Sequence, residues 1–414
     1  MACFVELMKE RQMMAQVTHE PELIRHLEEA PRTAYVGFDP TAESLHVGHL
    51  LPVLALRRWQ QCGHRVVVLL GGGTAMVGDP TGKTEMRKVS NVEEIDARAS
   101  RMVSQLSRLV DLSAPEKGVV VNNADWLRAL EYLPFLREVG AHFSVNRMLT
   151  AECFKTRLEK GLSFLEFNYM VLQSYDFLHL YKKHDCTVQL GGDDQWSNML
   201  GGMDLIRRTE GGKSFCFTVP LLVSSSGKKM GKTEAGAVWV DPEMTAPYDL
   251  FQYFRNIDDD MVEKCLLYFS DLPLQDVNRY SAMAGQDINE AKVRLAFEAT
   301  KLIHGEAEAT SAQDAASKVF SKGPDQGADI PEFTIDNSKV SGEKMGVLEL
   351  LVLSKIAPSK SEARRWVQQG GLSIDGKKVE DIKSDLSVSE LLRPEGVLVK
   401  KGKKRYYRLL ISGS

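Results

Sequence analysis

The chain has 414 residues, of which 43% are hydrophobic and 26% charged, and its formal net charge is −4. This composition excludes a disordered or fibrous protein, and the length allows two or three domains with at least one large core. No apolar run approaches the roughly 18 residues of a membrane helix, and the N-terminus lacks the layout of a signal peptide. We therefore expect a cytoplasmic protein that does not bind a membrane.

Charge is distributed unevenly along the chain. From residue 342 to the end there are 15 Lys and Arg against 9 Asp and Glu, a balance of +6 that leaves −10 for the remainder. A basic tail on an acidic body suggests a polyanionic partner at the C-terminus. The six cysteines show no C-x-x-C spacing, so we interpret them as buried apolar residues rather than zinc ligands or disulfides.

The first recognisable unit is a strand, a helix and a second strand. Residues 33–38 (TAYVGF) are rich in β-formers, residues 49–62 have helical apolar spacing, and residues 65–73 (RVVVLLGGG) indicate a strand buried on both faces. A βαβ unit predicts a parallel sheet and places a ligand at the carboxyl ends of its strands. The stretch DPTAESLHVGH (39–49) lies at such an end.

The rest of the chain alternates further strands and helices. We expect strands at 117–123 and 186–192, helices at 93–110, 124–138 and 164–182, and a helical pattern from 247 to about 320. Periodicity is lost at 321–333, which suggests a linker. In the tail, the spacing of Ser359 and Glu362 predicts a capping box at a helix start, and IDGKKV predicts a tight hairpin.

Several motifs could indicate other kinds of site. GDPTGKT (78–84) and GKKMGKT (227–233) are one residue short of the P-loop spacing, and GGG (71–73) lacks the dinucleotide register, which disfavours a Walker nucleotidase and an NAD enzyme. Apart from Glu43, no further Cys, His or Glu lies near His46 and His49 in the sequence, which is too few ligands for a zinc site, so we expect no metal there. Spacing alone leaves open that they are two surface histidines at a helix start.

A family resemblance appears when these motifs are taken in order. HVGH (46–49) resembles the HIGH signature of class I aminoacyl-tRNA synthetases, and KKMGKT (228–233) resembles their KMSKS loop. YVGFDPTAESLHVGH, GDPTGK, YMVLQSYDF and QLGGDDQW resemble the bacterial-type tyrosyl-tRNA synthetase family, and the basic tail resembles its S-four type RNA-binding domain. The similarity extends over nearly the whole chain.

The resemblance implies an α/β fold with a Rossmann-like parallel-sheet catalytic domain, a helical domain and a small C-terminal α+β RNA-binding domain. The expected boundaries are 1–225 for the catalytic domain with its inserted helices, 226–246 for a mobile KMSKS-type loop, 247–322 for the helical domain, 323–345 for a linker and 346–414 for the RNA-binding domain.

The resemblance also implies a tyrosine–tRNA ligase, which activates tyrosine with ATP to tyrosyl-adenylate and pyrophosphate and then transfers tyrosine to the 3′ end of tRNA(Tyr). The attacking carboxylate is already ionised, so the protein must supply positioning and hydrogen-bond donors rather than a base. His46 and His49 could provide such donors at the positive end of a helix, with Gly48 leaving room for adenine. We expect Lys229 and Lys232 to clamp the departing pyrophosphate.

The stretch FNYMVLQSYDFLHLY (167–181) is apolar on most sides, yet Tyr169, Gln173 and Asp176 recur on one helical face. Buried polar groups cost free energy unless they are paired, either in a core hydrogen-bond network or with a ligand. The family pattern implies a ligand, with Asp176 and Tyr35 on the substrate phenol. A site that hydrogen-bonds a hydroxyl rejects the analogue lacking it, a rule for which the tyrosyl enzyme is itself the standard example.

Other positions match the family's pocket. The ammonium group is expected to be held by Tyr169, Gln173 and Asp79, and the ATP and tyrosine pocket to be completed by Gly37, Asp39, Thr41, Gly192, Asp194 and Gln195. Asp194 is expected on the ribose, and Thr41 among the catalytic residues. Lys83 and Arg87 match basic residues near the phosphates, although a solvated loop explains them nearly as well. Asp193 replaces a common serine and would add negative charge beside ATP.

The tail carries the expected RNA-binding residues Lys360, Arg364, Arg365, Lys403, Lys404 and Arg405, with Trp366 as a stacking aromatic on the same helix. A charged surface helix is the alternative. The resemblance further implies a homodimer, tRNA(Tyr) as partner, and Mg²⁺ with the substrate ATP, without a bound metal or organic cofactor. Two other functions remain open: activation of tryptophan, which Tyr35 and Asp176 disfavour, and an RNA-binding or splicing protein that retains the fold.

Overall fold

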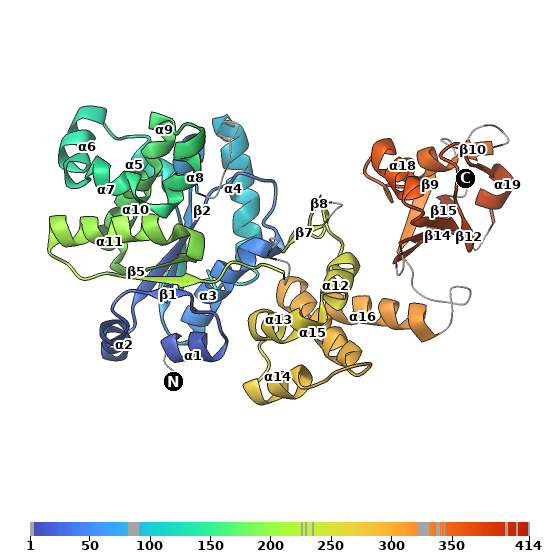
Figure 1. Cartoon of the computed structure of the whole chain (residues 1–414), viewed down its shortest axis with the longest axis horizontal. Helices are drawn as coiled ribbons and strands as arrows, with labels where there is room; N and C mark the ends of the chain where they lie inside the picture. The colour runs from blue at the N-terminus through green and yellow to red at the C-terminus, as the bar shows by residue number, and fades with distance from the viewer. Residues whose placement is uncertain are drawn as a thin grey trace. The chain divides into compact units, whose positions relative to one another are not determined.

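The computed structural model describes residues 4–81, 91–224, 227, 230–233, 236–321, 331–336, 340, 342, 344–393, 396–402 and 405–412. It divides into two compact units, residues 1–309 and 310–414 (Figure 1). Within the described residues no helix is long and apolar enough to cross a membrane.

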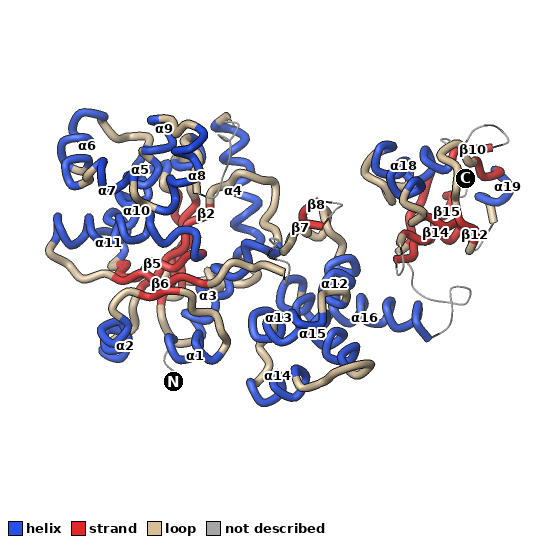
Figure 2. Tube along the Cα trace, viewed as in Figure 1, coloured by secondary structure: helices blue, strands red, loops and turns tan. Residues whose placement is uncertain are grey.

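The first unit is built on a six-stranded sheet with strand order β1-β6-β5-β2-β3-β4. Figure 2 shows the sheet in red with helices around it. Its strands are β1 Gln16–Val17, β2 Thr33–Phe38, β3 Arg65–Leu70, β4 Gly118–Asn122, β5 Cys186–Gly192 and β6 Phe215–Val219. All neighbours are parallel except β1, which joins β6 antiparallel at the edge. The parallel sheet is the expected one. The sequence reasoning missed β1, which has only two residues, and β6, although its run FCFTV is as long as β4 and is buried throughout.

Helices cover both faces of this sheet, as the almost continuous burial of β2 and β3 requires. Helix α3 (Leu50–Gln61) packs on β2, β3 and β5, whereas α10 (Tyr169–His184) and α11 (Trp196–Glu210) pack on each other and on β5. The other helices of this part are α1 Phe4–Glu10, α2 Glu20–Glu29, α4 Val92–Leu106, α5 Ala124–Leu127, α6 Tyr132–Glu138, α7 Val145–Leu149, α8 Glu152–Lys160 and α9 Phe164–Phe167.

Three expected helices have different limits. The helix expected over 124–138 is interrupted between α5 and α6, because Pro134 has no N–H and its ring would clash inside a continuous helix, whereas it fits the first turn of α6. The helix expected over 93–110 ends at Leu106. The helix expected over 164–182 is divided at Asn168 into α9 and α10.

A helical region follows the sheet and contains α12 Pro247–Arg255, α13 Val262–Phe269, α14 Leu274–Ser281, α15 Ile288–His304 and α16 Glu306–Ser321. Two buried arginines join it to the sheet region. Arg11 donates to the carbonyl oxygen of Ser270 at 2.9 Å, and Arg58 on α3 donates to those of Leu267 and Tyr268 at 3.1 and 3.0 Å. Both guanidinium groups thus satisfy carbonyls at the C-terminal end of α13, which otherwise lack intrahelical partners.

The second unit contains a five-stranded sheet of order β12-β11-β14-β15-β9. Its elements are β9 Glu332–Asp336, β10 Lys344–Gly346, α17 Val347–Leu353, α18 Lys360–Gln368, β11 Leu372–Ile374, β12 Lys377–Lys378, β13 Asp385–Ser387, α19 Val388–Leu391, β14 Val397–Lys401 and β15 Arg405–Ser412. The expected hairpin is present as β11 and β12, which turn at Asp375 and Gly376, both with positive φ.

The helix expected in the tail is α18, and the Ser359 side chain caps it by accepting from the backbone N–H of Glu362. One expectation on this helix is wrong. Trp366 is only 6% exposed because it belongs to the hydrophobic core of this unit, so its ring is not displayed for stacking on a base.

Candidate active site

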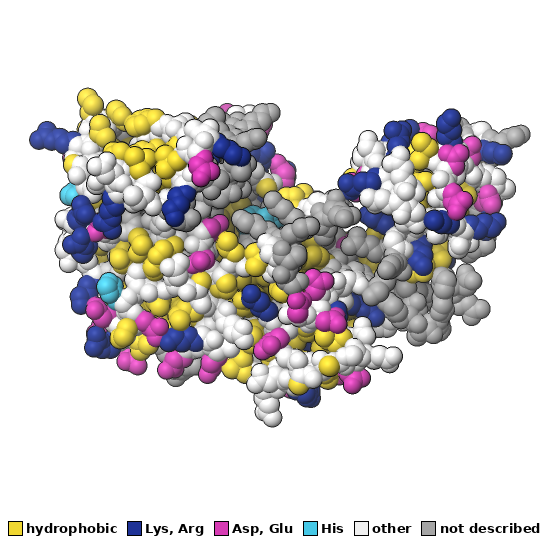
Figure 3. Space-filling model, in the orientation of Figure 1, with side chains coloured by type: hydrophobic (Ala, Val, Ile, Leu, Met, Phe, Trp, Pro, Cys, Tyr) yellow, Lys and Arg dark blue, Asp and Glu magenta, His cyan; other side chains and the backbone are white. Residues whose placement is uncertain are grey.

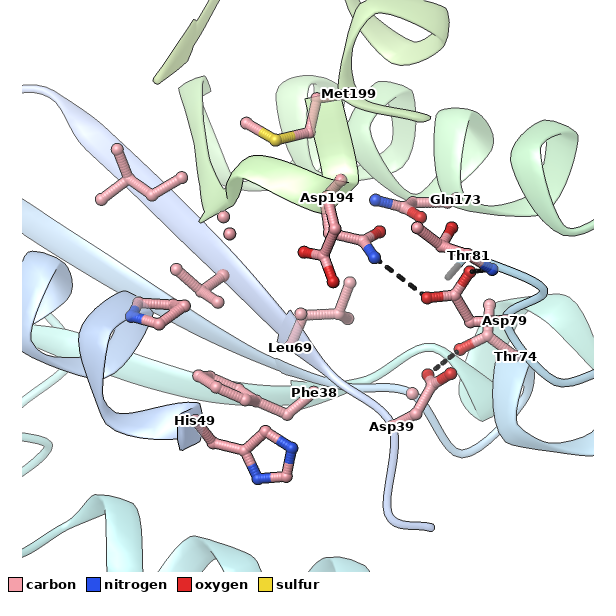
Figure 4. Close-up of a pocket in the computed structure, with 18 of the residues that line it drawn as sticks. Phe38, Asp39, His49, Leu69, Thr74, Asp79, Thr81, Gln173, Asp194 and Met199 are labelled. Atoms are coloured by element: carbon pink, nitrogen blue, oxygen red, sulfur yellow. Dashed lines mark hydrogen bonds between the residues drawn. The ribbon is translucent and has the colours of Figure 1, made fainter. Parts of the chain in front are cut away.

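A cavity of about 300 Å³ lies at the carboxyl ends of β5, β2 and β3, the neighbouring strands at the centre of the sheet (Figure 4). This location follows from the topology, because parallel strands end at one edge of the sheet and their connecting turns meet there. The cavity brings together all the expected pocket residues whose side chains are described: Tyr35, Gly37, Asp39, Thr41, His46, Gly48, His49, Asp79, Tyr169, Gln173, Asp176, Gly192, Asp194 and Gln195.

Asp176 and Tyr35 are buried groups that line this cavity, each only 1% exposed. Asn123 Nδ2 and Trp126 Nε1 each donate to one oxygen of the Asp176 carboxylate at 2.8 Å. Burial raises the pKa of Asp176 to about 7, although both donors favour its ionised form. The Tyr35 hydroxyl has no hydrogen-bond partner among the described residues, and burial raises its pKa well above the usual value.

Asp39, which follows β2, is held by two hydroxyl groups. Tyr169 donates to Oδ2 at 2.9 Å and Thr74 to Oδ1 at 2.7 Å, and Asn123 donates in turn to the Thr74 hydroxyl at 3.0 Å. The turn after β3 must contain glycine at 71, since a Cβ there would lie 1.9 Å from Asp39 Oδ1. The GGG motif therefore makes room for a carboxylate instead of a dinucleotide.

Asp79 forms a second acidic wall of the cavity. Its Oδ2 accepts from Gln195 Nε2 and its Oδ1 from the backbone N–H of Thr81, both at 2.9 Å. Gln173 Oε1 is buried without a hydrogen-bond partner among the described residues. In Figure 4 Asp79, Gln173 and Asp194 face the same space, with His49 on the opposite side. This end of the cavity presents acceptors to a cationic ligand.

The two histidines form a compact turn, residues 47–49, directly before α3. His46 Nδ1 accepts from the backbone N–H of Gly48 at 3.0 Å, His49 Nδ1 accepts from that of His46 at 3.3 Å, and the rings stack at 3.7 Å. Because Nδ1 is an acceptor in both rings, each neutral imidazole carries its proton on Nε2. Each ring therefore has one N–H donor, at Nε2, because the backbone N–H groups of the turn already donate to both Nδ1 atoms.

Asp193 is directed away from the cavity. Its Oδ1 accepts from Gln16 Nε2 at 2.7 Å and from the Thr218 hydroxyl at 2.9 Å, at the edge of the sheet where β1 meets β6. The extra negative charge expected beside ATP is therefore used to attach the N-terminal strand.

The remaining candidates are not part of this cavity as described. Lys83, Arg87, Lys229, Lys403 and Lys404 lie outside the described residues, and for Lys232 in β7 (Lys232–Thr233) and Arg405 in β15 only the backbone is described. In the second unit Lys360, Arg364 and Arg365 are exposed on α18.

Among the polar residues that line or support the cavity, sequence reasoning missed Thr74, Thr81, Asn123, Trp126 and Gln189. Gln189, on β5, is buried and its Oε1 has no hydrogen-bond partner among the described residues. A signal existed for Asn123, since polar residues directly follow the apolar run of β4, at the same edge of the sheet as the other turns. Trp126 gave no such signal, because a tryptophan in a short helix is ordinarily a packing residue.

Two known protein families together match nearly the whole chain. Residues 27–321 match the family described as tRNA synthetases class I (W and Y), and residues 326–409 match the tyrosine–tRNA ligase SYY-like C-terminal domain.

Individual relatives agree with these matches. The chain is 51% identical to a tyrosine–tRNA ligase of Clostridium tetani over 98% of each chain, and 50% identical to that of Caldanaerobacter subterraneus over 98% of this chain and 99% of the relative. Among solved structures, the C-terminally truncated mitochondrial tyrosyl-tRNA synthetase of Aspergillus nidulans superposes with a TM-score of 0.69 at 32% identity, covering 77% of this chain and 95% of the other.

Proposed function

The chain belongs to the tyrosine–tRNA ligase family of class I aminoacyl-tRNA synthetases, and we propose that the cavity at the carboxyl ends of β2, β3 and β5 is where it forms tyrosyl-adenylate. The reaction is the ATP-dependent activation of tyrosine followed by its transfer to tRNA(Tyr). Two buried groups carry the proposed site: the Asp176 carboxylate with its two N–H donors, and the Tyr35 hydroxyl, which has no hydrogen-bond partner among the described residues.

This pair suits a phenol better than other aromatic side chains. A phenol hydroxyl can donate to the Asp176 carboxylate and accept from Tyr35, so that both buried groups are satisfied. Phenylalanine would satisfy neither group, and the buried polar atoms would then cost free energy. An indole N–H could donate to Asp176 but offers no acceptor to Tyr35, which argues against tryptophan as the substrate.

The ammonium group of tyrosine is assigned to the acidic end of the cavity. Asp79, Tyr169 and Gln173 line that end, and the Gln173 amide oxygen is an acceptor that still lacks a hydrogen bond among the described residues. Gln195 acts through Asp79, to which its amide donates. Carboxylate and carbonyl oxygens around an ammonium group make charge-assisted hydrogen bonds, which are about twice as strong as neutral ones.

The ATP phosphates are assigned to the histidine turn. His46 and His49 each offer an Nε2–H donor beside the N-terminus of α3, where growing negative charge on the phosphates is favoured. The ATP site is completed by Gly37, Asp39, Thr41, Gly48, Gly192 and Asp194, which all line the cavity. We expect Mg²⁺ to bind as part of the ATP substrate, through its phosphates.

Lys229 and Lys232 remain the proposed clamp for pyrophosphate. The support is local: Met230, between them in sequence, lines the cavity, and its carbonyl oxygen would lie 3.4 Å from a Cβ on Gly48. Met230 and Gly231, which directly precede Lys232, therefore pass directly over the histidine turn.

A homodimer is proposed from an exposed apolar surface on the first unit. Eight large side chains on or beside α6, α7, α8 and α9 are between 37% and 73% exposed: Tyr132, Leu133, Leu136, Val145, Leu149, Leu158, Phe164 and Leu165. Figure 3 shows apolar side chains gathered over α6 and its neighbours. A contiguous apolar surface of this kind marks a protein interface, and a second copy is the partner that the family implies. Sedimentation of the Phe164→Asp variant should yield monomers.

The basic residues of the second unit are proposed to contact tRNA. Lys360, Arg364 and Arg365 are exposed on α18, and Lys401 Nζ lies 3.6 Å above the ring of Trp366 on the same helix. These cations form a basic surface that favours a polyanion. Arg364→Glu should leave amino-acid activation unchanged and slow transfer to tRNA. The loss should become smaller as the salt concentration rises, because salt screens the phosphate contact that the variant lacks.

Amino-acid-dependent exchange of labelled pyrophosphate into ATP, with each of the twenty amino acids, tests the proposed site. We expect exchange with tyrosine alone, and its loss in Asp176→Ala. Normal exchange by Asp176→Ala would overturn the assignment of Asp176 and Tyr35 to the substrate phenol. Absence of exchange with every amino acid would instead favour a protein that binds RNA without activating an amino acid.

A further inference from the structure

Tyr253, on α12 in the helical region, contacts the segment that passes over the histidine turn. The backbone N–H of Gly231 donates to the Tyr253 hydroxyl oxygen at 2.9 Å. The Tyr253 ring packs edge-on to Phe254 at 5.2 Å, and burial raises the pKa of its hydroxyl to about 12. A largely buried neutral hydroxyl on a packed helix is a stationary acceptor, so it can fix the backbone atom that donates to it.

A continuous series of backbone hydrogen bonds leads from this contact to the histidine turn. The Gly231 carbonyl accepts from the N–H of Val238 at 2.8 Å, and the Val238 carbonyl accepts from the N–H of Val47 at 3.0 Å. His46, the residue before Val47, forms an antiparallel bridge with Trp239. The hydroxyl is therefore the first member of a chain of three hydrogen bonds that ends inside HVGH.

Gly231 also lies so close to the turn that it has no room for a side chain. Its φ is +80°, and a Cβ on it would lie 2.9 Å from the backbone nitrogen of Gly48. The Gly48 N–H is the group that donates to His46 Nδ1. A displacement of Gly231 would thus disturb the hydrogen bond that determines which nitrogen of His46 carries the proton.

We propose that Tyr253 is a positioning residue for tyrosine activation, whose hydroxyl holds Gly231 against the HVGH turn and so orients the imidazole donors. This inference rests on the proposed function of His46 and His49. It makes the helical region part of the activation site, because Tyr253 on α12, the first helix of that region, holds Gly231 beside the histidine turn where the ATP phosphates would bind.

The test compares two tyrosine-to-phenylalanine variants. Tyr253→Phe removes the hydroxyl that accepts from Gly231, whereas Tyr268→Phe, on α13, removes a hydroxyl that donates to the carbonyl of Gln12 at 3.1 Å, away from the cavity lining. Both are measured in the full-length protein for thermal unfolding, for tyrosine affinity, and for the single-turnover rate of tyrosyl-adenylate formation at saturating ATP.

For Tyr253→Phe we expect adenylate formation to slow by about 3- to 10-fold, the factor that corresponds to one neutral hydrogen bond, with tyrosine affinity unchanged. Tyr268→Phe should form adenylate at the wild-type rate. In a His46→Ala background the effect of Tyr253→Phe should shrink, because the hydroxyl acts through a group that is already absent.

An unchanged rate in Tyr253→Phe, a loss that Tyr268→Phe reproduces, or an undiminished effect in the His46→Ala background would each overturn the inference. If the wild-type protein forms adenylate and His46→Ala slows its formation, each of these three outcomes refutes the role of Tyr253 and leaves the proposed function unaffected. If the wild-type protein forms no adenylate, the proposed function fails and the inference fails with it.

Discussion

Replacing Trp126 by phenylalanine should make tyrosine binding depend more strongly on pH. The indole Nε1 is one of two donors to the buried Asp176 carboxylate, and phenylalanine keeps most of the ring that stacks on His179 at 4.1 Å. A hydrogen bond to a charged group contributes about 1.5–3 kcal/mol, which corresponds to a tenfold to hundredfold change in an ionisation constant. Loss of the donor disfavours the ionised form, so the pKa of Asp176 should rise further above its value of about 7.

The sign of the effect follows from the form of Asp176 that binds the phenol. If the carboxylate must be ionised to accept from the substrate, wild-type affinity for tyrosine should weaken as the pH falls below about 7 and be constant above it. In Trp126→Phe the same decline should begin at higher pH. At pH 7.5, about half a unit above the wild-type pKa, this change in the ionisation constant should lower the ionised fraction of Asp176, and with it the affinity for tyrosine, about 3- to 25-fold. The variant should regain affinity towards pH 9.

Equilibrium titration of tyrosine between pH 6 and pH 9 measures this effect, with Asp176→Asn as a reference that cannot ionise. A loss of affinity in Trp126→Phe that is equal at every pH would refute the reasoning. That outcome would mean that the indole contributes packing to the cavity rather than charge stabilisation.

Three further perturbations test other parts of the structure. Gly231→Ala should slow adenylate formation about tenfold or more, since a positive φ alone costs about 1–2 kcal/mol in a non-glycine residue and the Cβ would meet Gly48; single-turnover rates measure this. Arg157→Met should lower the free energy of unfolding by about 3–5 kcal/mol in urea, because it leaves the buried Glu166 carboxylate without its bidentate partner, and Glu166→Leu in the same chain should restore much of it. Burial lowers the pKa of His304 to about 4 from its ordinary 6.5, so between these pH values the unfolded chain binds more protons than the folded chain. The free energy of unfolding should therefore fall as the pH decreases from about 6.5 to 4. Urea titrations of His304→Gln should show a smaller fall.

Local patterns in the sequence were sufficient for much of the fold. Runs of β-forming and apolar residues predicted β2, β3, β4 and β5, and the βαβ order predicted their parallel pairing and the edge at which the cavity lies. These signals are local because a strand that is buried on both faces carries apolar side chains at successive positions. The two-residue β1 is too short to show any periodicity, and it was found only in the structure. The apolar run of β6 is as long as that of β4 but was not predicted.

The identity of the cavity residues could be predicted before folding was considered: the family resemblance selected Tyr35, Asp176 and the two histidines, and the structure brings them to one cavity. How those groups are held became visible in the folded chain alone. The donors to Asp176 come from Asn123 and Trp126, about 50 residues away along the chain, and the direction of Asp193 depends on an edge strand that arrives from the N-terminus. Hydrogen bonds between distant segments leave no periodic trace in either segment, because each partner is chosen by where the chain folds back rather than by its neighbours in sequence.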